Sequence, residues 1–354
     1  MNGWTRNNCD LRTAIITNVN PDIICISETH LSNNKDNQPN VEGYTWIGHC
    51  RTLRHVRSMR NFGGVGLLYK NYLAQYYDIS VISQSFEGIL GILFSNRLTD
   101  LQFVIFSVYL PPEESPWGRD SDNFFAHLLS VIYLHVHVDH IFIAGDLNAR
   151  VGNLVDHIEY IDDMQTRTTI DNVKNKHGHS LIDFLIESKM MILNGRITPE
   201  LDNYTSVSTR GSAVVDYVLT GHNSGNTCEK VEVLLSNDLV DKFNLNALLG
   251  EHCKTPDHSM VLCTLQFEHT VDSDDAHCNQ GDQVNNVSNR KKVYYFDSVP
   301  DNFMNNDLFK NTLHTLIQRM ERCESNQEML NSIYEDLCQT LLQEMDNHLQ
   351  FKDC

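Results

Sequence analysis

The sequence predicts an α/β fold with many strands and comparatively few helices, and three observations lead to this prediction. With 41% hydrophobic and 21% charged residues over 354 positions, the chain can bury a large core. Two stretches, 124–135 and 180–190, repeat apolar residues at the three-and-four spacing of a helix. Six runs have strand length and a high content of β-branched residues: 22–28, 63–70, 103–110, 140–146, 213–219 and 258–265.

In chain order, the runs DIICISE, GGVGLLYK and FVIFSVYL are the first three predicted strands. FFAHLLSVIYLH follows as a helix, and the strand HIFIAGD then reaches Gly145, which permits a close backbone turn. SLIDFLIESKM is the second helix, and AVVDYVL and HSMVLCTL are the last two strands. Asp146 and Asn148 therefore stand where a buried strand ends, a position at which functional sites are often built.

The last part of the chain has a different composition. Residues 268–295 are polar and poor in apolar side chains, which predicts a linker. Beyond it, 296–354 carries apolar residues at helical spacing and predicts two amphipathic helices, either a small appendage or the start of another domain. We therefore expect one large domain over 1–267, a linker, and a helical segment.

Charge and apolar content restrict the classes of protein that the chain can represent. The formal net charge of −19 argues against a protein that holds nucleic acid by bulk electrostatics. It does not exclude a nuclease, because metal sites need carboxylates and a locally basic rim can steer a polyanion. No long apolar run is present, the N-terminus is polar, and the ten cysteines are scattered without zinc spacing. These features predict an intracellular protein without a membrane partner and with reduced cysteines.

Polar residues stand at the ends of five strand-like runs. Taken singly, each has a structural explanation as a helix cap, a turn former or a paired core carboxylate. Together they supply what hydrolysis of a phosphodiester requires: carboxylates for a hard cation, a base for water, and donors for the charge that grows on phosphorus. The residues are Glu28, Tyr109, Asp146 with Asn148, Asp216, and Asp257 with His258.

The chemistry of each side chain suggests its role. Glu28 and Asp257 could bind a divalent cation, which takes one or two carboxylates and keeps several waters. Asp146 suits the activation of water. Asn148, Tyr109 and His258 can donate hydrogen bonds to phosphate oxygens, and Asp216 is available to hold the histidine in one tautomer.

The stretches PDIICISETHL, SVYLPP, GDLNARVG, SAVVDYVL and PDHSMV, in this order, resemble the successive motifs of the endonuclease/exonuclease/phosphatase superfamily. The residues of these motifs are most similar to those of the endonuclease domain of non-long-terminal-repeat retrotransposons, over about residues 2–267. The resemblance implies a four-layer sandwich of two mostly antiparallel β-sheets flanked by helices. It also implies nicking of double-stranded DNA in the nucleus with Mg²⁺ or Mn²⁺, and a reverse transcriptase of the parent element as a further partner.

The resemblance also implies roles for individual residues. Asp257 and His258 match the family's terminal aspartate-histidine pair, and Asp216 matches the aspartate that orients the histidine. Thr205 in NYTSV matches a polar residue near the DNA. The remaining matches are the metal-binding glutamate (Glu28), the phosphate-contacting tyrosine (Tyr109), the water-activating aspartate (Asp146) and its asparagine partner (Asn148).

Two positions depart from the family pattern. The family's first motif has a catalytic asparagine two residues before an Asn-Gly pair, which is Asn2-Gly3 here, so we expect the first strand and its asparagine to be missing. Pro256 stands where relatives commonly carry serine, and it removes a backbone donor. Lower stability and activity are expected from the first departure. Two alternatives remain open: an inactive DNA- or protein-binding remnant, and a superfamily phosphatase or phospholipid phosphodiesterase.

A basic stretch offers a candidate for binding DNA phosphates outside the metal site. In HCRTLRHVRSMRN, Arg51, Arg54, Arg57 and Arg60 are spaced three apart, as on a short helix or a cationic loop. The alternative is a solvated polar loop, since charge runs are commonly plain surface. Arg210, in STRGSA, lies on a predicted hairpin near Asp216, where it could reach a groove or stabilise the turn.

Overall fold

The computed structural model forms two compact units, Met1–Val271 and Asp272–Cys354. The second unit contains the helices α6 (Asp307–Glu321) and α7 (Gln327–His348) and the antiparallel strands β14 (Lys292–Tyr295) and β15 (Gln350–Asp353). The two C-terminal helices confirm the expectation for this region. The structure describes residues 3–4, 8–31, 38–51, 63–116, 118–159, 161–162, 164–251, 253–267, 292–295, 299–300, 302–322 and 327–353.

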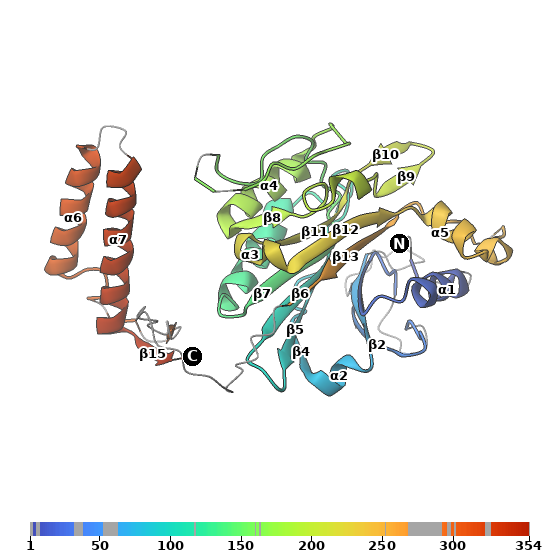
Figure 1. Ribbon diagram of the computed structural model, residues 1–354, viewed down its shortest axis with the longest axis horizontal. Helices are drawn as coiled ribbons and strands as arrows, with labels where there is room; N and C mark the ends of the chain where they lie inside the picture. Colours follow the sequence, from blue (N-terminus) through green and yellow to red (C-terminus); the bar gives the residue numbers. More distant parts are fainter. Residues whose placement is uncertain are drawn as a thin grey trace, which may run out of the picture. The chain divides into compact units, whose positions relative to one another are not determined.

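A six-stranded sheet is the largest element of the first unit, in the order β4-β5-β6-β7-β11-β8. Its neighbours are antiparallel except for β6 and β7, which run parallel (Figure 1). The parallel pair is connected through a helix, α3, as parallel strands require. The strands are β4 (Tyr77–Ser83), β5 (Ile89–Asn96), β6 (Gln102–Tyr109), β7 (His140–Asp146), β8 (Met190–Ile192) and β11 (Asp216–Gly221).

Two smaller sheets make up a second layer. One is three-stranded, in the order β1-β3-β2, and the other pairs β12 with β13. Apolar residues of β3 pack with those of β5, β6 and β7, and residues of β12 pack with those of β8 and β11, so both small sheets cover one face of the large sheet. The strands are β1 (Ile23–Ser27), β2 (Tyr44–His49), β3 (Val65–Lys70), β12 (Cys228–Leu234) and β13 (Met260–Leu265).

Helices cover both outer faces, which completes the four layers and confirms the expected fold class. The helices α3 (Ser121–Leu134) and α4 (Lys176–Ser188) pack on the free face of the large sheet (Figure 1). The helices α1 (Cys9–Val19) and α5 (Ser236–Lys242) share a cluster on the side of the small sheets. Shorter elements are α2 (Leu73–Tyr76), η2 (Pro199–Leu201), β9 (Ser206–Ser208), β10 (Gly211–Ala213), η3 (His222–Thr227) and η4 (Leu245–Leu248).

The two helices expected in this unit begin earlier than their apolar spacing suggested. The Asp120 side chain accepts a hydrogen bond from the amide of Asn123, and the Asn175 side chain accepts one from the amide of Gly178. Each side chain satisfies a backbone donor that the first helical turn leaves unpaired. A polar cap and a polar first turn therefore extend both helices toward the N-terminus, beyond the apolar stripe.

The run 213–219, expected as one strand, is divided into two. Its first residue belongs to β10, which pairs with β9 in a hairpin, whereas β11 begins only at Asp216. Between them, the amide of Val214 donates to Asp171 and the amide of Val215 donates to Thr205. Side-chain acceptors thus replace a strand neighbour and turn the chain between the two pieces.

The boundaries of the linker stay a prediction, because 268–291 lies outside the described residues. Within the described part of the chain, no helix combines the length and the apolar character needed to cross a bilayer.

A hydrogen-bond bridge joins the two sheet layers at the end of β1. The Ser27 hydroxyl donates to the carbonyl of Val108 at 2.7 Å and accepts from the amide of Asp146 at 3.1 Å. Gly145, with φ +153°, leaves room for Ser27, because a β-carbon there would lie 2.9 Å from the Ser27 Oγ and would also collide with the Val108 carbonyl oxygen of the neighbouring strand β6. The close approach of the layers therefore depends on a serine and a glycine.

Replacing Ser27 with alanine should destabilise the fold. Ser27→Ala leaves a buried carbonyl and a buried amide without this partner, so the free energy of unfolding should fall by about 1–3 kcal/mol. Urea denaturation followed by circular dichroism measures the change.

Ser83→Ala is the matched control for this experiment. Ser83 is as buried as Ser27, at 6% against 7% exposure, but its hydroxyl has no hydrogen-bond partner among the described residues. The control should therefore cost less than about 0.5 kcal/mol. Equal losses in the two variants would contradict the role given to Ser27.

Candidate active site

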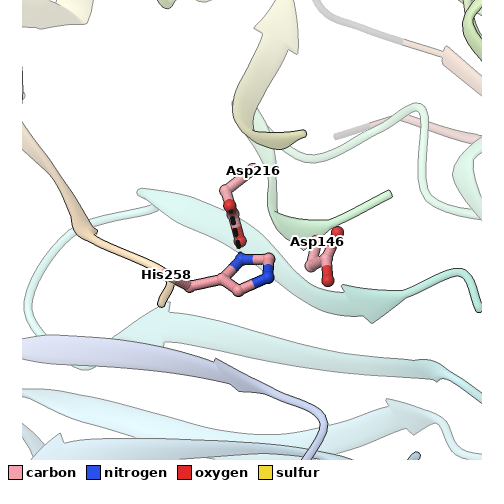
Figure 2. Close-up of side chains that lie close together, drawn as sticks. All are labelled: Asp146, Asp216 and His258. Atoms are coloured by element: carbon pink, nitrogen blue, oxygen red, sulfur yellow. Dashed lines mark hydrogen bonds and ion pairs between the residues drawn. The ribbon is translucent and has the colours of Figure 1, made fainter. Parts of the chain in front are cut away.

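Two carboxylates face each other across neighbouring strands of the large sheet. Asp146 ends β7 and Asp216 begins β11, and the antiparallel register pairs the two residues directly. His258 lies just before β13 and completes a cluster whose ligand atoms all lie within 4.8 Å of one another (Figure 2). The register of one strand pair therefore sets the geometry of the cluster.

His258 is held by Asp216. Its Nδ1 lies 2.8 Å from the Asp216 Oδ2, and Figure 2 shows the second ring nitrogen on the side of Asp146. Because a carboxylate accepts, Nδ1 carries a proton and Nε2 is the atom that faces Asp146. Burial alone would lower the pKa of His258. The charge and the hydrogen bond of Asp216, with the charge of Asp146, outweigh it and raise the pKa to about 9.

Burial shifts the pKa of Asp146 in the opposite direction, because the charged form of this side chain is the deprotonated one. Its side chain is 4% exposed, and burial, with the neighbouring charge of Asp216, raises its pKa to about 7. His258 and a hydrogen bond from the amide of Asn148 act in the other direction. A carboxyl group that titrates near neutrality can both accept and release a proton at physiological pH.

Asn148 fixes the orientation of the Asp146 carboxylate. Its amide donates to Oδ1 at 2.9 Å, and its side-chain Nδ2 lies 3.3 Å from Oδ2 and 2.9 Å from the carbonyl oxygen of Leu110. Asn148 adopts a left-handed conformation with φ 45°, which asparagine tolerates better than most residues. The tight turn after β7 therefore places both amide groups of one residue on one carboxylate.

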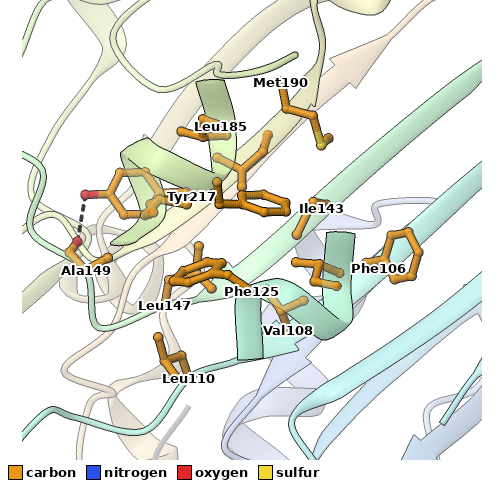
Figure 3. Packing of buried hydrophobic residues seen from close by; sticks show 14 of the residues in the cluster. Phe106, Val108, Leu110, Phe125, Ile143, Leu147, Ala149, Leu185, Met190 and Tyr217 are labelled. Atoms are coloured by element: carbon orange, nitrogen blue, oxygen red, sulfur yellow. Dashed lines mark hydrogen bonds between the residues drawn. The ribbon is translucent and has the colours of Figure 1, made fainter. Parts of the chain in front are cut away.

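The buried core anchors the strand that carries Asp216. The Tyr217 hydroxyl lies within hydrogen-bond distance of the carbonyl oxygens of Ala149 and Val214, at 2.9 and 2.8 Å, and its ring packs in the cluster under α4 (Figure 3). Thr205 accepts hydrogen bonds from the amides of Val215 and Asp216. The start of β11 is thus fixed by a buried tyrosine in the core and by a buried threonine just before β9.

Glu28 and Tyr109 form a second polar group beside the first. The Tyr109 hydroxyl donates to Glu28 Oε1 at 3.2 Å, and His30 Nε2 lies 3.3 Å from the same oxygen. Burial acts to raise the pKa of Glu28, but the interactions with His30 and Tyr109 outweigh burial and lower the pKa. Glu28 is therefore ionised. Tyr109 pairs in register with Asp146, and burial and the charges of Glu28 and Asp146 raise its pKa, which keeps it a donor.

Arg12, on α1, was not expected from the sequence. Burial lowers the pKa of its guanidinium to about 10, and negative charges that include Asp257 and Glu28 partly oppose the shift. Arg12 is 4% exposed and lies in the helical stripe of Leu11, Ile15 and Ile16. An arginine within an apolar stripe was the signal that could have revealed it.

A family model identifies the fold and the motifs together. Residues 10–236 match the endonuclease/exonuclease/phosphatase family. The chain belongs to this family. Its structure is similar to an AP endonuclease from Leishmania major, with a TM-score of 0.55 and 13% identity over 75% of this chain and 86% of that one. At this identity the likeness shows the fold alone.

Two further solved structures are similar to the chain with lower TM-scores. An AP endonuclease from Archaeoglobus fulgidus has a TM-score of 0.49 and 16% identity over 75% of this chain and 96% of its own. A 3′-5′ exonuclease from Neisseria meningitidis has a TM-score of 0.48 and 14% identity over 75% and 98%. None of the curated proteins matches the sequence.

In this endonuclease/exonuclease/phosphatase chain, two residues predicted to contact DNA have partners within the protein. The Arg51 side chain is 9% exposed and its Nε lies 2.9 Å from Glu87 Oε2, so it is not a surface arginine. Thr205 is fully buried under the start of β11, where its hydroxyl serves the backbone. Arg210 is exposed on the β9–β10 turn. Three expected contacts lie outside the described residues: Arg54, Arg57 and Arg60.

The donor set suits a hard divalent cation only in part. Asp146, Asp216 and Glu28 offer carboxylate oxygens, which such a cation prefers. His258 holds a proton below about pH 9 and is a hydrogen-bond donor rather than a ligand in that range. Glu28 and Asp257, the expected metal ligands, do not belong to the cluster of Asp146, Asp216 and His258. Carboxylate ligands therefore fit, whereas a cation on His258 would first have to displace the proton that this ring holds.

The contribution of Asp146 and His258 to the stability of the metal-free protein should fall as the pH rises from about 4 to 9. The pKa of His258 is raised from 6.5 to about 9, so its stabilisation is complete below 6.5 and is lost through 9. The pKa of Asp146 is raised from 3.8 to about 7, so its protonated form favours the fold below 3.8 and this advantage is lost through 7. Both groups act in the same direction.

Urea denaturation in a chelator between pH 5 and about 10 measures this dependence. Asp146→Asn should flatten the curve below pH 7, and His258→Gln should flatten it above about pH 7. A pH dependence that both variants share with the original chain would show that the cluster does not titrate as described.

Proposed function

We propose that the chain is a divalent-metal-dependent DNA endonuclease that nicks one strand of double-stranded DNA. The observation that carries this proposal is a buried carboxyl group with a pKa near neutrality, Asp146, beside a protonated histidine held by a second carboxylate. A base and an acid thus lie side by side, as in-line displacement at phosphorus requires. Membership of the endonuclease/exonuclease/phosphatase family supports the reaction class.

Asp146 is the proposed general base. Its carboxylate takes the proton of the attacking water, and the two amide groups of Asn148 keep the carboxylate in one orientation. Asp216, whose charge helps raise the Asp146 pKa, increases the proton affinity of this base. The same repulsion is relieved when the proton arrives, so proton transfer is favoured by the site itself.

His258 and Tyr109 are the proposed donors to the phosphate. The imidazolium carries a positive charge at neutral pH, and the Tyr109 hydroxyl keeps its proton because burial and neighbouring negative charges raise its pKa. Both can donate to oxygens that gain charge in the transition state. Asp216 keeps His258 in position through the bond to Nδ1.

Glu28 is the proposed metal ligand, with Asp257 as a second one. Glu28 is ionised, partly exposed at 26%, and lies beside Tyr109 on the same side of the cluster. A magnesium or manganese ion, when bound, supplies positive charge to a phosphate oxygen and orients it. Arg12 adds a fixed positive charge that interacts electrostatically with both Asp257 and Glu28.

The retrotransposon type and the DNA substrate rest on the motifs and on a similar protein. Five ordered motifs resemble the endonuclease domain of non-long-terminal-repeat retrotransposons. A nick with a free 3′ hydroxyl would prime a reverse transcriptase of the parent element, and this places the proposed activity in the nucleus. The similar Leishmania major protein is an AP endonuclease. Arg210, exposed on the β9–β10 turn, is available to a phosphate backbone.

The purified chain with magnesium should relax supercoiled plasmid by nicking. Asp146→Asn removes the base without changing the shape of the side chain, so the nicking rate should fall at least about 100-fold. Agarose gel electrophoresis of nicked and supercoiled plasmid measures the rate. Asp183→Asn, an exposed position on α4, is the matched control and should nick as the original chain does.

If Asp146→Asn and the original chain behave identically, the proposal fails. The original chain inactive on plasmid but active on a phospholipid or inositol phosphate would replace DNA with a lipid substrate. A chain inactive on both would support the non-catalytic alternative.

Magnesium should stabilise the protein through Glu28. Binding that adds about 1 kcal/mol would raise the Tm by about 2–4 °C, and Glu28→Gln should remove this rise. His258→Gln should keep it, because a protonated imidazole is not a ligand. Differential scanning fluorimetry with and without magnesium measures both. The reverse pattern would assign the metal to the cluster of Asp146, Asp216 and His258.

A further inference from the structure

Two cysteine thiols meet on the face of β12 and β13 that packs on the large sheet. The Sγ atoms of Cys228 and Cys263 lie 3.3 Å apart, and both residues pack in the cluster that includes Met191 and Val218. Cys228 is buried, whereas Cys263 is partly exposed and lines a cavity of about 480 Å³ that β13 borders. A small molecule can therefore reach the pair through Cys263.

An irregularity in the β12–β13 ladder shapes this contact. Cys228 pairs with Leu265 and Val231 pairs with Cys263, so the two cysteines are not directly opposite each other. The register shifts between Cys228 and Lys230, where β12 contains one extra residue. A bulge of this kind bends its strand and redirects side chains. It therefore permits a contact between sulfurs at positions that are diagonal in the ladder.

Main-chain hydrogen bonds fix the two strands on both sides of the pair. Before Cys228, the carbonyl of Thr227 accepts from the amide of Gln266 at 2.7 Å. At the other end, the ladder continues to the pairing of Leu234 with Met260. The two sulfurs would have to approach by about 1.3 Å to reach the disulfide bond length of about 2.0 Å. This is a small movement for two side chains that are already held together by their strands.

The electrostatic state of Cys228 differs from that of an ordinary buried cysteine. Burial raises the pKa of Cys25 to about 12, which keeps that thiol protonated. The hydrogen bond with Cys263 lowers the pKa of Cys228, and the same bond, together with burial, raises the pKa of Cys263. Because the thiolate is the reactive form of cysteine, Cys228 is the nucleophile and Cys263 the thiol that follows it.

We propose that Cys228 and Cys263 form an oxidation site, at which a peroxide produces a disulfide between β12 and β13. The Cys228 thiolate attacks one oxygen of hydrogen peroxide, the O–O bond breaks, and hydroxide leaves a sulfenic acid on Cys228. The Cys263 sulfur then attacks the Cys228 sulfur, the S–O bond breaks, and the departing hydroxide takes the Cys263 proton. The hydroxide of the first step becomes water with the proton that Cys228 gave up. In total the two thiols lose two electrons, and the peroxide is reduced to two molecules of water.

The disulfide ties down the segment that carries part of the candidate active site. The two cysteines are 35 positions apart, and the segment between them contains α5, Asp257 and His258. Within it, the Ser236 hydroxyl donates to the carbonyl of His258 at 2.7 Å. A cross-link closes this segment into a loop and lowers the entropy of the unfolded chain, so oxidation stabilises the fold around His258. This stabilisation does not depend on the proposed endonuclease activity.

Treatment of the full chain with hydrogen peroxide, in a buffer that contains a chelator, tests the proposal. Mass spectrometry of peptides, after alkylation of the remaining thiols, should find residues 228 and 263 of one molecule in a single cross-linked product. After removal of the peroxide, the Tm should be higher by at least about 5 °C than that of the reduced chain. A reductant should restore the original Tm, because a disulfide is reversible and the higher oxides of sulfur are not.

Two serine variants separate the pair from the other cysteines. Cys263→Ser removes the second sulfur, so it should lose both the cross-link and the rise in Tm. Cys338→Ser is the matched control, because Cys338 is a half-buried cysteine like Cys263 but lies on α7. The control should keep the cross-link and the full rise in Tm.

Three results would overturn the proposal. The first is the absence of the cross-link between residues 228 and 263 in the peroxide-treated original chain. The second is a cross-link that leaves the Tm unchanged or lower, which would show that the disulfide does not stabilise the fold. The third is a rise in Tm that Cys263→Ser retains. Because the cross-link is mapped on the unaltered protein, the test holds even if Cys263→Ser does not fold.

Discussion

The candidate site depends on one constraint, the register that pairs Asp146 with Asp216 across β7 and β11. Two carboxyl groups side by side in a buried position cannot both be ionised without a compensating charge. Burial and the charge of Asp216 raise the pKa of Asp146 to about 7, and His258, held by Asp216, supplies the positive charge that limits this rise. The electrostatic properties that make the site chemically useful follow from this pairing.

Much of the fold serves to hold the register and the two layers in place. Ser27 joins the layers beside Asp146, and Gly145 permits their close approach. Tyr217 and Thr205 anchor the start of β11 from the core. Tyr109, which pairs in register with Asp146, links the cluster to Glu28. The proposed base, donors and metal ligand thus lie on neighbouring strand ends that share one rigid support.

The sequence was informative where a local pattern sets the structure. Short β-branched runs predicted the fold class, and the polar residues at strand ends identified Asp146, Asp216 and His258, which the structure brings together. The register that places Asp146 directly opposite Asp216 could not be predicted from the sequence, because strand pairing joins residues that are 70 positions apart in the chain.

Partners distant in sequence also explain features that the local patterns do not reveal. Arg51, predicted to bind DNA phosphates, pairs with Glu87 in the folded chain. Thr205, predicted near DNA, is fully buried and accepts hydrogen bonds from the start of β11. Arg12 was overlooked because only the folded chain brings its charge near Asp257 and Glu28.

The most direct test of the account is the pKa of His258 in the metal-free protein. An NMR titration of the labelled imidazole should give a value near 9, and Asp216→Asn should lower it toward the ordinary value of 6.5. The chemical shifts should also show Nδ1 protonated throughout, because Asp216 accepts from it. A pKa near 6.5 in the original chain, unchanged by Asp216→Asn, would contradict the proton arrangement on which the proposed mechanism rests.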